Sequence, residues 1–410
     1  MAQVTGGMTA GEAADRLGVK TATLYAYVSR GVLRRRRGPT GQSVFDPEEV
    51  ERLARRGRPR HRPSTGDAEI VIESAVTALG ADRPYFRGRD GLALAAATPF
   101  ESVAEWLWTG DPAVLDEPPA PWAPPAAGVA AARAAQSGLP ADLLPLERLQ
   151  VIVPALGATD PLRANLDPAA VLDVGRALIA GMVASLPPAS PTASFPATGA
   201  IAAQLWSRLA PGRPRARLAD ALRMALVLLA DHELAASTFA VRVAASVRAD
   251  PYAVVMAGLG TVSGPLHGGA SLGAEALLAE AAGPTGVRDA VGLRLRRGDR
   301  IPGFGHAVYR PTDGRAGVLL DRVRALAPNH PVLAVADALL VEVHRRRLPE
   351  PNIDFALAVL SRVAGLRTGS GEAIFAVART AGWLAHAREE YQHRTRLRPR
   401  AVYIGPSIGE

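Results

Sequence analysis

The sequence GPLHGGA at residues 264–270 places His267 among glycines, and GFGHAVYRPTDGR at residues 303–315 does the same for His306. Glycines beside a histidine let the backbone approach a bound ligand closely. A third histidine, His232, lies in the sequence DHELAAST, and the sequence PNIDF carries Asp354. Four such groups in one chain form a candidate site and not a set of isolated motifs.

These residue types suit one kind of reaction. A histidine donates a hydrogen bond to a carbonyl oxygen that is gaining negative charge, and a carboxylate removes a proton from the adjacent carbon. The set therefore predicts proton abstraction next to a carbonyl. Two other interpretations remain open from the residues alone. His232 could be a structural histidine whose hydrogen bonds are all made within the protein, and Asp354 could be a helix cap.

Six motifs in this order resemble the citrate synthase family over about residues 68–408. In chain order they are YFRGRD, DHELAASTFAVRVAAS, GPLHGGA, GFGHAVYRPTDGR, PNIDF and the closing RPRAVYIGP. The resemblance implies an all-α fold with a large domain of residues 68–267 and 371–410 and a small domain of residues 268–370. The active site would lie in the cleft between the two domains.

The resemblance also implies roles for individual residues. Asp354 would be the general base on the methyl group of acetyl-CoA, His267 would stabilise the resulting enolate, and His306 would polarise the carbonyl of oxaloacetate. The carboxylates of oxaloacetate would be held by four residues: His232, Arg315, Arg379 and Arg398. Arg398 would reach across from a partner subunit, which implies a homodimer, and Arg310 would lie near the CoA phosphates. No metal or cofactor is implied, since acetyl-CoA is a substrate.

The predicted product is citrate, released with CoA after hydrolysis of a thioester intermediate. One alternative is a 2-methylcitrate synthase that uses propionyl-CoA, because a single methylene gives modest discrimination. Another is a DNA-binding regulator whose synthase-like body senses metabolites. The sequence also departs from the family pattern at Ala235, Ser271 and Gly314, which bears on the fit of the acyl-CoA.

Composition limits the class of protein. The 410 residues are enough for more than one domain, and alanine, leucine and arginine favour helix. The sequence contains no cysteine, which excludes disulfides and thiolate catalysis. A signal sequence and a run of 18 apolar residues are both lacking, so we expect a cytoplasmic protein without a membrane partner.

The positive charge is concentrated at the N-terminus. Residues 1–63 hold thirteen basic and six acidic residues, which gives +7 of the net charge of +8. Such asymmetry favours a separate module with a polyanionic partner. Residues 57–64, rich in proline and arginine, are predicted to be a linker, which we place at residues 57–67.

The pattern of residues 1–56 predicts a winged helix-turn-helix. Thr9 and Glu12 have the spacing of a capping box, a second helix fits residues 21–30, and Asp46-Pro47 begins a third. The stretch from Met8 to about Arg56 resembles the MerR and excisionase type. If it binds DNA, residues 20–27 would face the major groove and Arg34–Arg37 would contact phosphate or the minor groove. The alternative is a basic domain that only docks on the rest of the protein.

Overall fold

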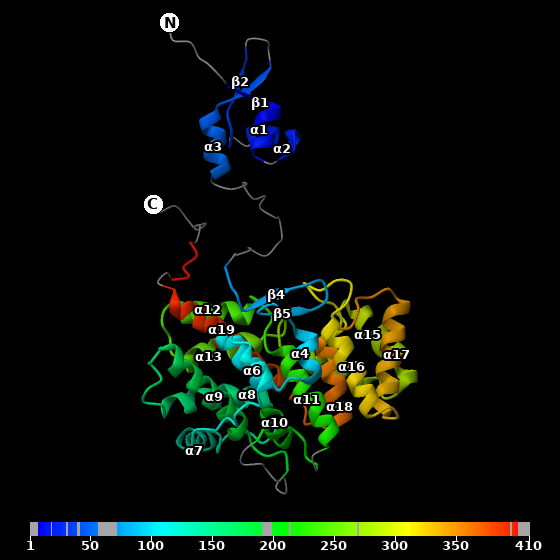
Figure 1. Ribbon diagram of the computed structural model, residues 1–410. Helices are drawn as coiled ribbons and strands as arrows, with labels where there is room; N and C mark the ends of the chain where they lie inside the picture. Colours follow the sequence, from blue (N-terminus) through cyan, green and yellow to red (C-terminus); the bar gives the residue numbers. More distant parts are fainter. Residues whose placement is uncertain are drawn as a thin grey trace, which may run out of the picture. The chain divides into compact units, whose positions relative to one another are not determined.

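The computed structural model describes residues 7–17, 19–29, 32–38, 42–55, 72–190, 199–212, 215–268, 270–393 and 396–400. The chain divides into two compact units, Met1–Ile72 and Glu73–Glu410, and each is described by itself (Figure 1). The helix ends predicted at Gly18 and Gly31, the linker at residues 57–67 and the tail after Arg400 lie outside the described residues.

The N-terminal unit is a three-helix domain with a small sheet. Its elements are β1 (Met8–Thr9), α1 (Ala10–Arg16), α2 (Thr21–Ser29), β2 (Arg35–Arg37), β3 (Ser43–Phe45) and α3 (Pro47–Arg55). The antiparallel sheet has the order β1-β3-β2, and β2-β3 form the predicted wing. The capping box is confirmed, because the Thr9 hydroxyl accepts from the Glu12 N–H and the Glu12 carboxylate accepts from the Thr9 N–H. Strand β1 was not predicted.

The core of this unit corrects one prediction about its DNA-facing surface. Its buried side chains are Ala13, Ala14, Leu24, Tyr27, Leu33, Phe45 and Val50. Tyr27 is only 4% exposed, so it packs in the core and is not available to a DNA groove. Tyr25, by contrast, is exposed, as are the four arginines of Arg34–Arg37.

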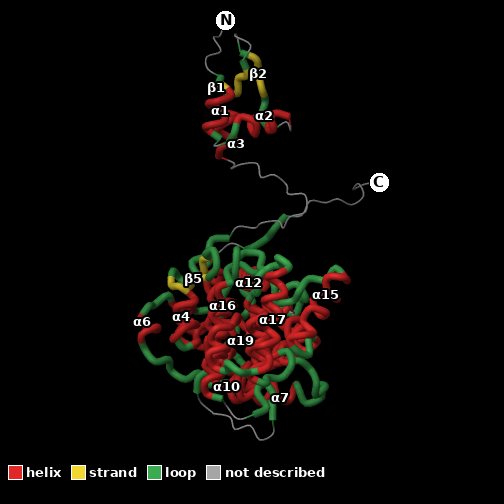
Figure 2. Tube along the Cα trace, turned by 90° about the vertical axis from the view of Figure 1, so that its right-hand side faces the viewer, coloured by secondary structure: helices red, strands yellow, loops and turns green. Residues whose placement is uncertain are grey.

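The second unit is mostly helical, as predicted (Figure 2). Its helices are α4 (Gly91–Ala97), α5 (Phe100–Thr109), α6 (Ala113–Asp116), α7 (Ala126–Ala135), α8 (Pro145–Ala158), α9 (Pro168–Ser185), α10 (Ile201–Leu209), α11 (Ala216–Leu229), α12 (Ala236–Ser246), α13 (Pro251–Val262), α14 (Ala270–Glu280), the 3₁₀ turn η1 (Pro284–Gly286), α15 (Val287–Arg297), α16 (Gly314–Leu326), α17 (Pro331–Arg345), α18 (Ile353–Ala364) and α19 (Ser370–Gln392). A small antiparallel sheet of β4 (Thr77–Leu79), β5 (Pro84–Phe86) and β6 (Arg89–Asp90) was not predicted.

The long helix α19 forms the centre of this unit. It packs against α5, α8, α9, α11, α12 and α13, and also against α14 and α18. Nearly all of its residues are buried, including charged ones such as Arg379 and Glu390. A helix that is buried on every side must satisfy its polar groups with neighbouring elements. This requirement brings segments from distant parts of the sequence onto α19.

Helix α9 is long and apolar enough, by length and composition alone, to cross a membrane. Half of its apolar stretch is buried against other helices of the unit, as expected of a core helix. Helices α14 to α18 pack on one another, and α15, α16 and α17 lie together in Figure 1. The division into domains at residues 268 and 370 stays a prediction.

Candidate active site

One cavity of about 630 Å³ collects most of the predicted site residues. It lies where the segment before α12, the turn before α14, the loop between α15 and α16, and helices α16, α18 and α19 meet. Its lining includes His232, His267, His306, Arg315, Asp354 and Arg379. These six residues are separated by up to 147 positions in the sequence, and the fold brings them to one place.

The ring of His267 is oriented by a hydrogen-bonded pair that the motifs did not indicate. Its Nε2 lies 2.8 Å from the Ser237 hydroxyl, which also accepts from the Trp383 indole N–H at 3.3 Å. Because the indole is only a donor, the Ser237 O–H is free to donate to Nε2. With Ser237 as the donor, Nε2 is unprotonated and the ring proton is on Nδ1, which is the tautomer that the proposed chemistry requires. His267 is thus held as a neutral donor through Nδ1.

His306 takes the opposite tautomer. Its Nδ1 accepts from the backbone N–H groups of Val308 and Tyr309, each at 3.0 Å. The ring proton is therefore on Nε2, which lies 3.3 Å from Arg315 Nη2. The His306 Nε2–H and the Arg315 Nη2–H are both donors and do not hydrogen-bond to each other, so both remain available to oxygen atoms of a ligand.

His232 completes a cluster of rings. Its ring centroid lies 5.2 Å from that of His306 and 5.1 Å from that of Tyr309. The side chain is 9% exposed, and its Nε2 has no hydrogen-bond partner among the described residues. Within the described residues Nε2 is thus not satisfied, and a buried polar atom of this kind is suited to a ligand.

Two buried arginines give the cavity its positive charge. Arg315 is 2% exposed and donates to both carboxylate oxygens of Asp313 at 2.9 Å. Arg379 is 1% exposed, stacks over the Phe375 ring at 4.5 Å and donates from Nε to the Leu229 carbonyl oxygen. Buried guanidinium groups with donors left over are suited to carboxylates, whose geometry they match.

Asp354 has the environment of a general base. It sits in the first turn of α18, whose cap is Asn352, because the Asn352 side chain accepts from the N–H groups of Asp354 and Phe355. The interpretation of Asp354 as a helix cap is therefore wrong. Burial raises the pKa of Asp354 to about 7, although Arg315 and Arg379 act against this rise. A carboxyl with a pKa near neutrality is matched to proton transfer at physiological pH.

The histidines stay neutral over the same range. Burial, assisted by Arg379, lowers the pKa of His267 to about 4. Burial and Arg315 lower the pKa of His306 to about 4. Burial, with Arg315 and Arg379, lowers the pKa of His232 well below its usual value. Neutral imidazoles donate hydrogen bonds to a carbonyl without competing for the proton that Asp354 takes.

Two predicted residues do not line this cavity. Arg310 is exposed, and its backbone N–H donates to the Ala81 carbonyl oxygen. Arg398 is also exposed and lies outside the residues of the cavity wall, while its predicted role belongs to the site of a partner subunit. Both roles stay predictions. Arg300, which the motifs did not indicate, is an exposed cation on the cavity wall.

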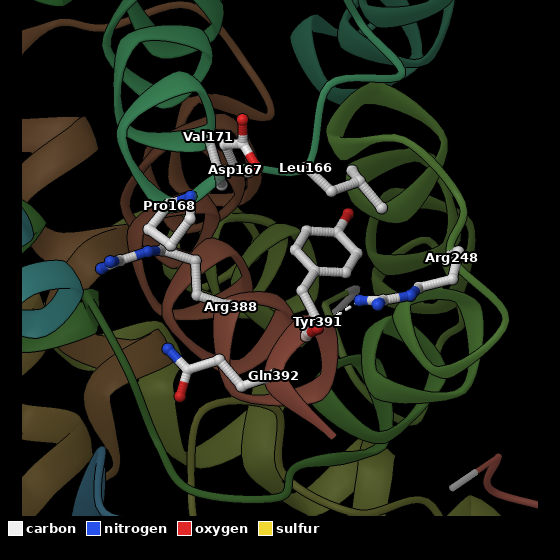
Figure 3. Close-up of a pocket in the computed structure, with 8 residues that line it drawn as sticks. All are labelled: Leu166, Asp167, Pro168, Val171, Arg248, Arg388, Tyr391 and Gln392. Atoms are coloured by element: carbon white, nitrogen blue, oxygen red, sulfur yellow. Dashed lines mark hydrogen bonds between the residues drawn. The ribbon is translucent and has the colours of Figure 1, made fainter. Parts of the chain in front are cut away.

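A second cavity, of about 310 Å³, lies at the far end of α19 (Figure 3). Arg248 and Arg388 lie on either side of Tyr391 there, and Arg248 donates to the Tyr391 carbonyl oxygen. The Tyr391 hydroxyl is already bonded to the Ala249 carbonyl oxygen at 2.7 Å. Among the described residues that line this cavity there is no histidine and a single carboxylate, Asp167, so they do not provide the groups for the predicted chemistry.

The groups in this cavity are of the class that suits chemistry on carbon acids. A carboxylate of raised pKa, neutral histidine donors of both tautomers and two buried arginines suit proton abstraction from one substrate and binding of a second, anionic one. Among the described residues, no group of three or more His, Asp or Glu side chains is arranged to hold a metal ion.

Comparison with known proteins agrees with this class. The family model "Citrate synthase, C-terminal domain" matches residues 67–400, and the model "MerR HTH family regulatory protein" matches residues 8–56. The chain therefore belongs to the citrate synthase family and carries a MerR-type helix-turn-helix at its N-terminus. The mostly helical fold and the family resemblance predicted from the motifs are confirmed.

Curated relatives include both synthase activities. "Putative citrate synthase 2" of Mycobacterium tuberculosis (strain ATCC 25618 / H37Rv) is 40% identical over 200 residues, or 48% of this chain and 54% of the relative. "Citrate synthase 2" of Bacillus subtilis (strain 168) is 37% identical over 46% of this chain and 51% of the relative. "2-methylcitrate synthase 1" of Corynebacterium glutamicum is 32% identical over 44% of this chain and 48% of the relative. The chain spans about half the length of the curated relatives it matches.

Solved structures share the fold over most of their length. The crystal structure of citrate synthase from Thermotoga maritima MSB8 aligns with a TM-score of 0.66 at 25% identity, and covers 84% of this chain and 96% of that chain. A citrate synthase from Thermoplasma acidophilum, in a ternary complex with carboxymethyl coenzyme A and oxaloacetate, aligns with the same TM-score at 24% identity. At that identity the second alignment supports the fold alone.

Proposed function

We propose that this chain is an acyltransferase that condenses acetyl-CoA with oxaloacetate and water to give citrate and CoA. The observation that carries the proposal is the convergence of His267, His306 and Asp354 with Arg315 and Arg379 in one cavity. Each of these groups has a burial, a tautomer or a pKa that fits its part in the reaction. The family membership and the names of the relatives support the same activity.

The first chemical step is the removal of a proton from the acetyl methyl group. Asp354 takes this proton, and its pKa of about 7 allows it to act as a base near neutral pH. The His267 Nδ1–H donates to the thioester oxygen, which gains negative charge as the enolate forms. The Ser237 hydroxyl, bonded to Nε2 of the same ring, keeps this donor oriented.

The second step forms the carbon–carbon bond. The enolate carbon attacks the ketone carbon of oxaloacetate, and the electron pair of the C=O bond moves onto its oxygen. The His306 Nε2–H, hydrogen-bonded to that oxygen, gives it the proton that makes it the hydroxyl group of the product, and water returns a proton to the ring. Arg315, Arg379 and His232 hold the two carboxylates, so the charge of the substrate is neutralised in a buried site. Water then hydrolyses the thioester of the product, which releases CoA and makes the sequence irreversible.

The test is to supply purified protein with oxaloacetate and either acetyl-CoA or propionyl-CoA, and to follow the release of CoA thiol. The protein has no cysteine, so every thiol that appears comes from CoA. Faster release with acetyl-CoA is expected. Faster release with propionyl-CoA would assign the 2-methylcitrate synthase activity instead, and no release with either would refute the enzyme.

The pH dependence of the reaction follows from the raised pKa of Asp354. The base must be ionised, so kcat/KM for acetyl-CoA should rise about tenfold per pH unit below pH 7 and level off above it. His267 and His306 do not contribute to this limb, because their pKa values are near 4. The measurement is the initial rate of CoA release from pH 5 to 9.

A control variant distinguishes the titration of Asp354 from that of a second buried carboxyl group. Burial and the neighbouring Glu275 raise the pKa of Glu372 to about 7 as well, but Glu372 does not line the cavity. In the variant Glu372→Gln, kcat/KM should therefore still rise with pH below pH 7. If this variant lost the rise of kcat/KM below pH 7, that pH dependence would be assigned to Glu372 and not to Asp354.

We also propose that the N-terminal unit binds double-stranded DNA. Arg34–Arg37 are exposed along the wing, and Tyr25 is exposed on α2, which is the second helix of the helix-turn-helix. Exposed arginines next to such a helix are suited to phosphate contacts on either side of a major groove. The match of residues 8–56 to the MerR model supports this proposal.

Removal of residues 1–63 should abolish DNA binding while CoA release continues. The measurement is a gel mobility shift at fixed low salt, with the full chain as the reference, because phosphate contacts weaken steeply as salt rises. Equal shifts from the full and shortened chains would contradict the proposal and leave the basic unit as a docking domain.

We further propose that the synthase part forms a homodimer in which the partner's Arg398 completes the substrate site. Within one chain this residue is exposed and outside the cavity. Light scattering after gel filtration measures the mass of the particle, and a monomer that retains full activity would refute the proposal.

A further inference from the structure

We propose that His386 is a positioning residue for the oxaloacetate site, and that it acts through the buried carboxylate of Asp231. The inference rests on the proposed function, because it concerns how His232 and Arg379 are held for the second substrate. His386 does not line the cavity. It lies behind the cavity wall, in a polar network that the chemistry described above does not use.

This network is fully buried and charged. His386, Asp231 and Arg242 are each 0% exposed. Arg242 Nε bonds Glu390 at 2.6 Å, and its Nη1 bonds Glu389 at 2.6 Å and His386 Nδ1 at 3.0 Å. On its other side, His386 Nε2 lies 3.3 Å from Asp231 Oδ2. The imidazole is therefore the link between the Arg242 network and Asp231.

The partners determine which way each hydrogen bond runs. Arg242 is only a donor, so Nδ1 of His386 accepts. The ring proton is then on Nε2, which donates to Asp231 Oδ2. The other oxygen of this carboxylate, Oδ1, makes no close hydrogen bond among the described residues, although the buried Thr77 hydroxyl also acts on Asp231 and lowers its pKa. The His386 bond is thus a main side-chain contact that orients this carboxylate.

Asp231 in turn holds the backbone that carries His232. Its Oδ2 accepts from the Glu233 N–H at 3.1 Å, across the histidine. Glu233 has a φ of +53°, a left-handed conformation that is unfavourable for a residue with a side chain. The bond from Asp231 stabilises this strained turn, and the turn fixes the place of the His232 ring against His306 and Tyr309.

The segment that carries Asp231 lies close against α19. The Gly382 N–H donates to the Ala230 carbonyl oxygen at 2.9 Å. A Cβ at residue 382 would overlap Asp231 Oδ1 and lie 2.5 Å from the Ala230 carbonyl oxygen, so only glycine permits this approach. Arg379 and His386 precede and follow Gly382 on the same helix, which places the carboxylate between them.

Asp231 is also a counter-charge for Arg379. Burial alone would raise the pKa of Asp231, but His386 and Arg379 together lower it, so the carboxylate stays ionised. Its position therefore affects both groups that we assign to the substrate carboxylates, His232 through the turn and Arg379 through charge. A loss of His386 should therefore raise the KM for oxaloacetate more than it lowers kcat.

Two substitutions separate the two hydrogen bonds of His386. His386→Asn keeps an acceptor near Nδ1 for Arg242 but removes the donor to Asp231. His386→Gln places an amide N–H near the position of Nε2 and restores that donor. We expect His386→Asn to raise the KM for oxaloacetate about tenfold, with kcat and the KM for acetyl-CoA changed by less than about threefold, and His386→Gln to stay near the wild type.

A matched control lies one turn further along the helix. Tyr391→Phe removes a hydrogen bond of 2.7 Å between α19 and Ala249 without touching Asp231. It should lower the melting temperature while leaving the KM for oxaloacetate unchanged. If His386→Asn matched this control, with a lower melting temperature and an unchanged KM, His386 would be structural only and the inference would be overturned.

The remaining outcomes are equally decisive. An equal rise of KM in His386→Asn and His386→Gln would show that the donor to Asp231 is not the cause, which also overturns the inference. The wild-type chain in the same assay keeps the two proposals apart. If it releases no CoA, the proposed function has failed, and if it is active but the variants share its KM, only the positioning role has failed.

Discussion

Asp354→Ala is expected to lower kcat by about 10³-fold or more while the affinity for oxaloacetate stays nearly the same. General-base catalysis typically contributes about 10²- to 10⁴-fold, and Asp354 is the one carboxylate among the described residues that line the cavity, so none of them can replace it as the base. In the proposed function Arg315, Arg379 and His232 hold oxaloacetate, and the loss of a nearby negative charge should not weaken the binding of an anion by these groups. CoA release measures the first effect, and calorimetric titration with oxaloacetate measures the second.

Asp337→Ala is the control for this variant. Asp337 is an exposed carboxylate on α17 whose partner is Arg324, so its removal should leave turnover unchanged. Full activity in Asp354→Ala would refute the assignment of the base. A loss of oxaloacetate binding together with turnover would show instead that Asp354 supports the shape of the site.

Asp313→Ala is expected to destabilise the synthase part by about 3–5 kcal/mol. Asp313 is 4% exposed and forms a bidentate ion pair with Arg315. Its removal therefore leaves a buried guanidinium group without its counter-charge. The same carboxylate caps α16 through the Arg315 N–H and accepts from the Ile353 N–H at the start of α18. The measurement is the free energy of unfolding from denaturant titration.

Asp321→Ala provides the comparison on the same helix. Asp321 pairs with Arg324 on the surface of α16, and its side chain is 77% exposed. Exposed pairs of this kind contribute about 0–1 kcal/mol, so this variant should unfold almost as the wild type does. Similar losses in the two variants would contradict the argument that burial makes the Asp313 pair important.

The sequence motifs indicated most of the polar groups that line the candidate site because each motif is local. A histidine beside glycines, or the aspartate of the sequence PNIDF, is visible in a few consecutive residues. In the N-terminal unit the Thr9–Glu12 capping box and the Pro47 helix start were predicted for the same reason, since a cap depends on residues three positions apart. The assignment of Tyr27 to the DNA-facing surface was wrong, because the short helix α2 packs Leu24 and Tyr27 together in the core.

The groups that orient the site were not predicted. Ser237 lies 30 positions from His267, and Asp231 lies 155 positions from His386. No local pattern distinguishes these residues from ordinary buried polar ones. The strands β4 to β6 were not predicted either, because segments of two or three residues are too short to show an alternation of apolar and polar residues.

Local sequence was thus sufficient for the helical class, the N-terminal helix-turn-helix and most of the polar groups that line the candidate site. The tautomers of His267 and His306, the raised pKa of Asp354 and the part played by Asp231 were decided only by the tertiary structure. The physical reason is that a tautomer or a pKa depends on burial and on hydrogen-bond partners. Those are contributed by helices far apart in the chain that meet only when α19 is packed at the centre of the fold.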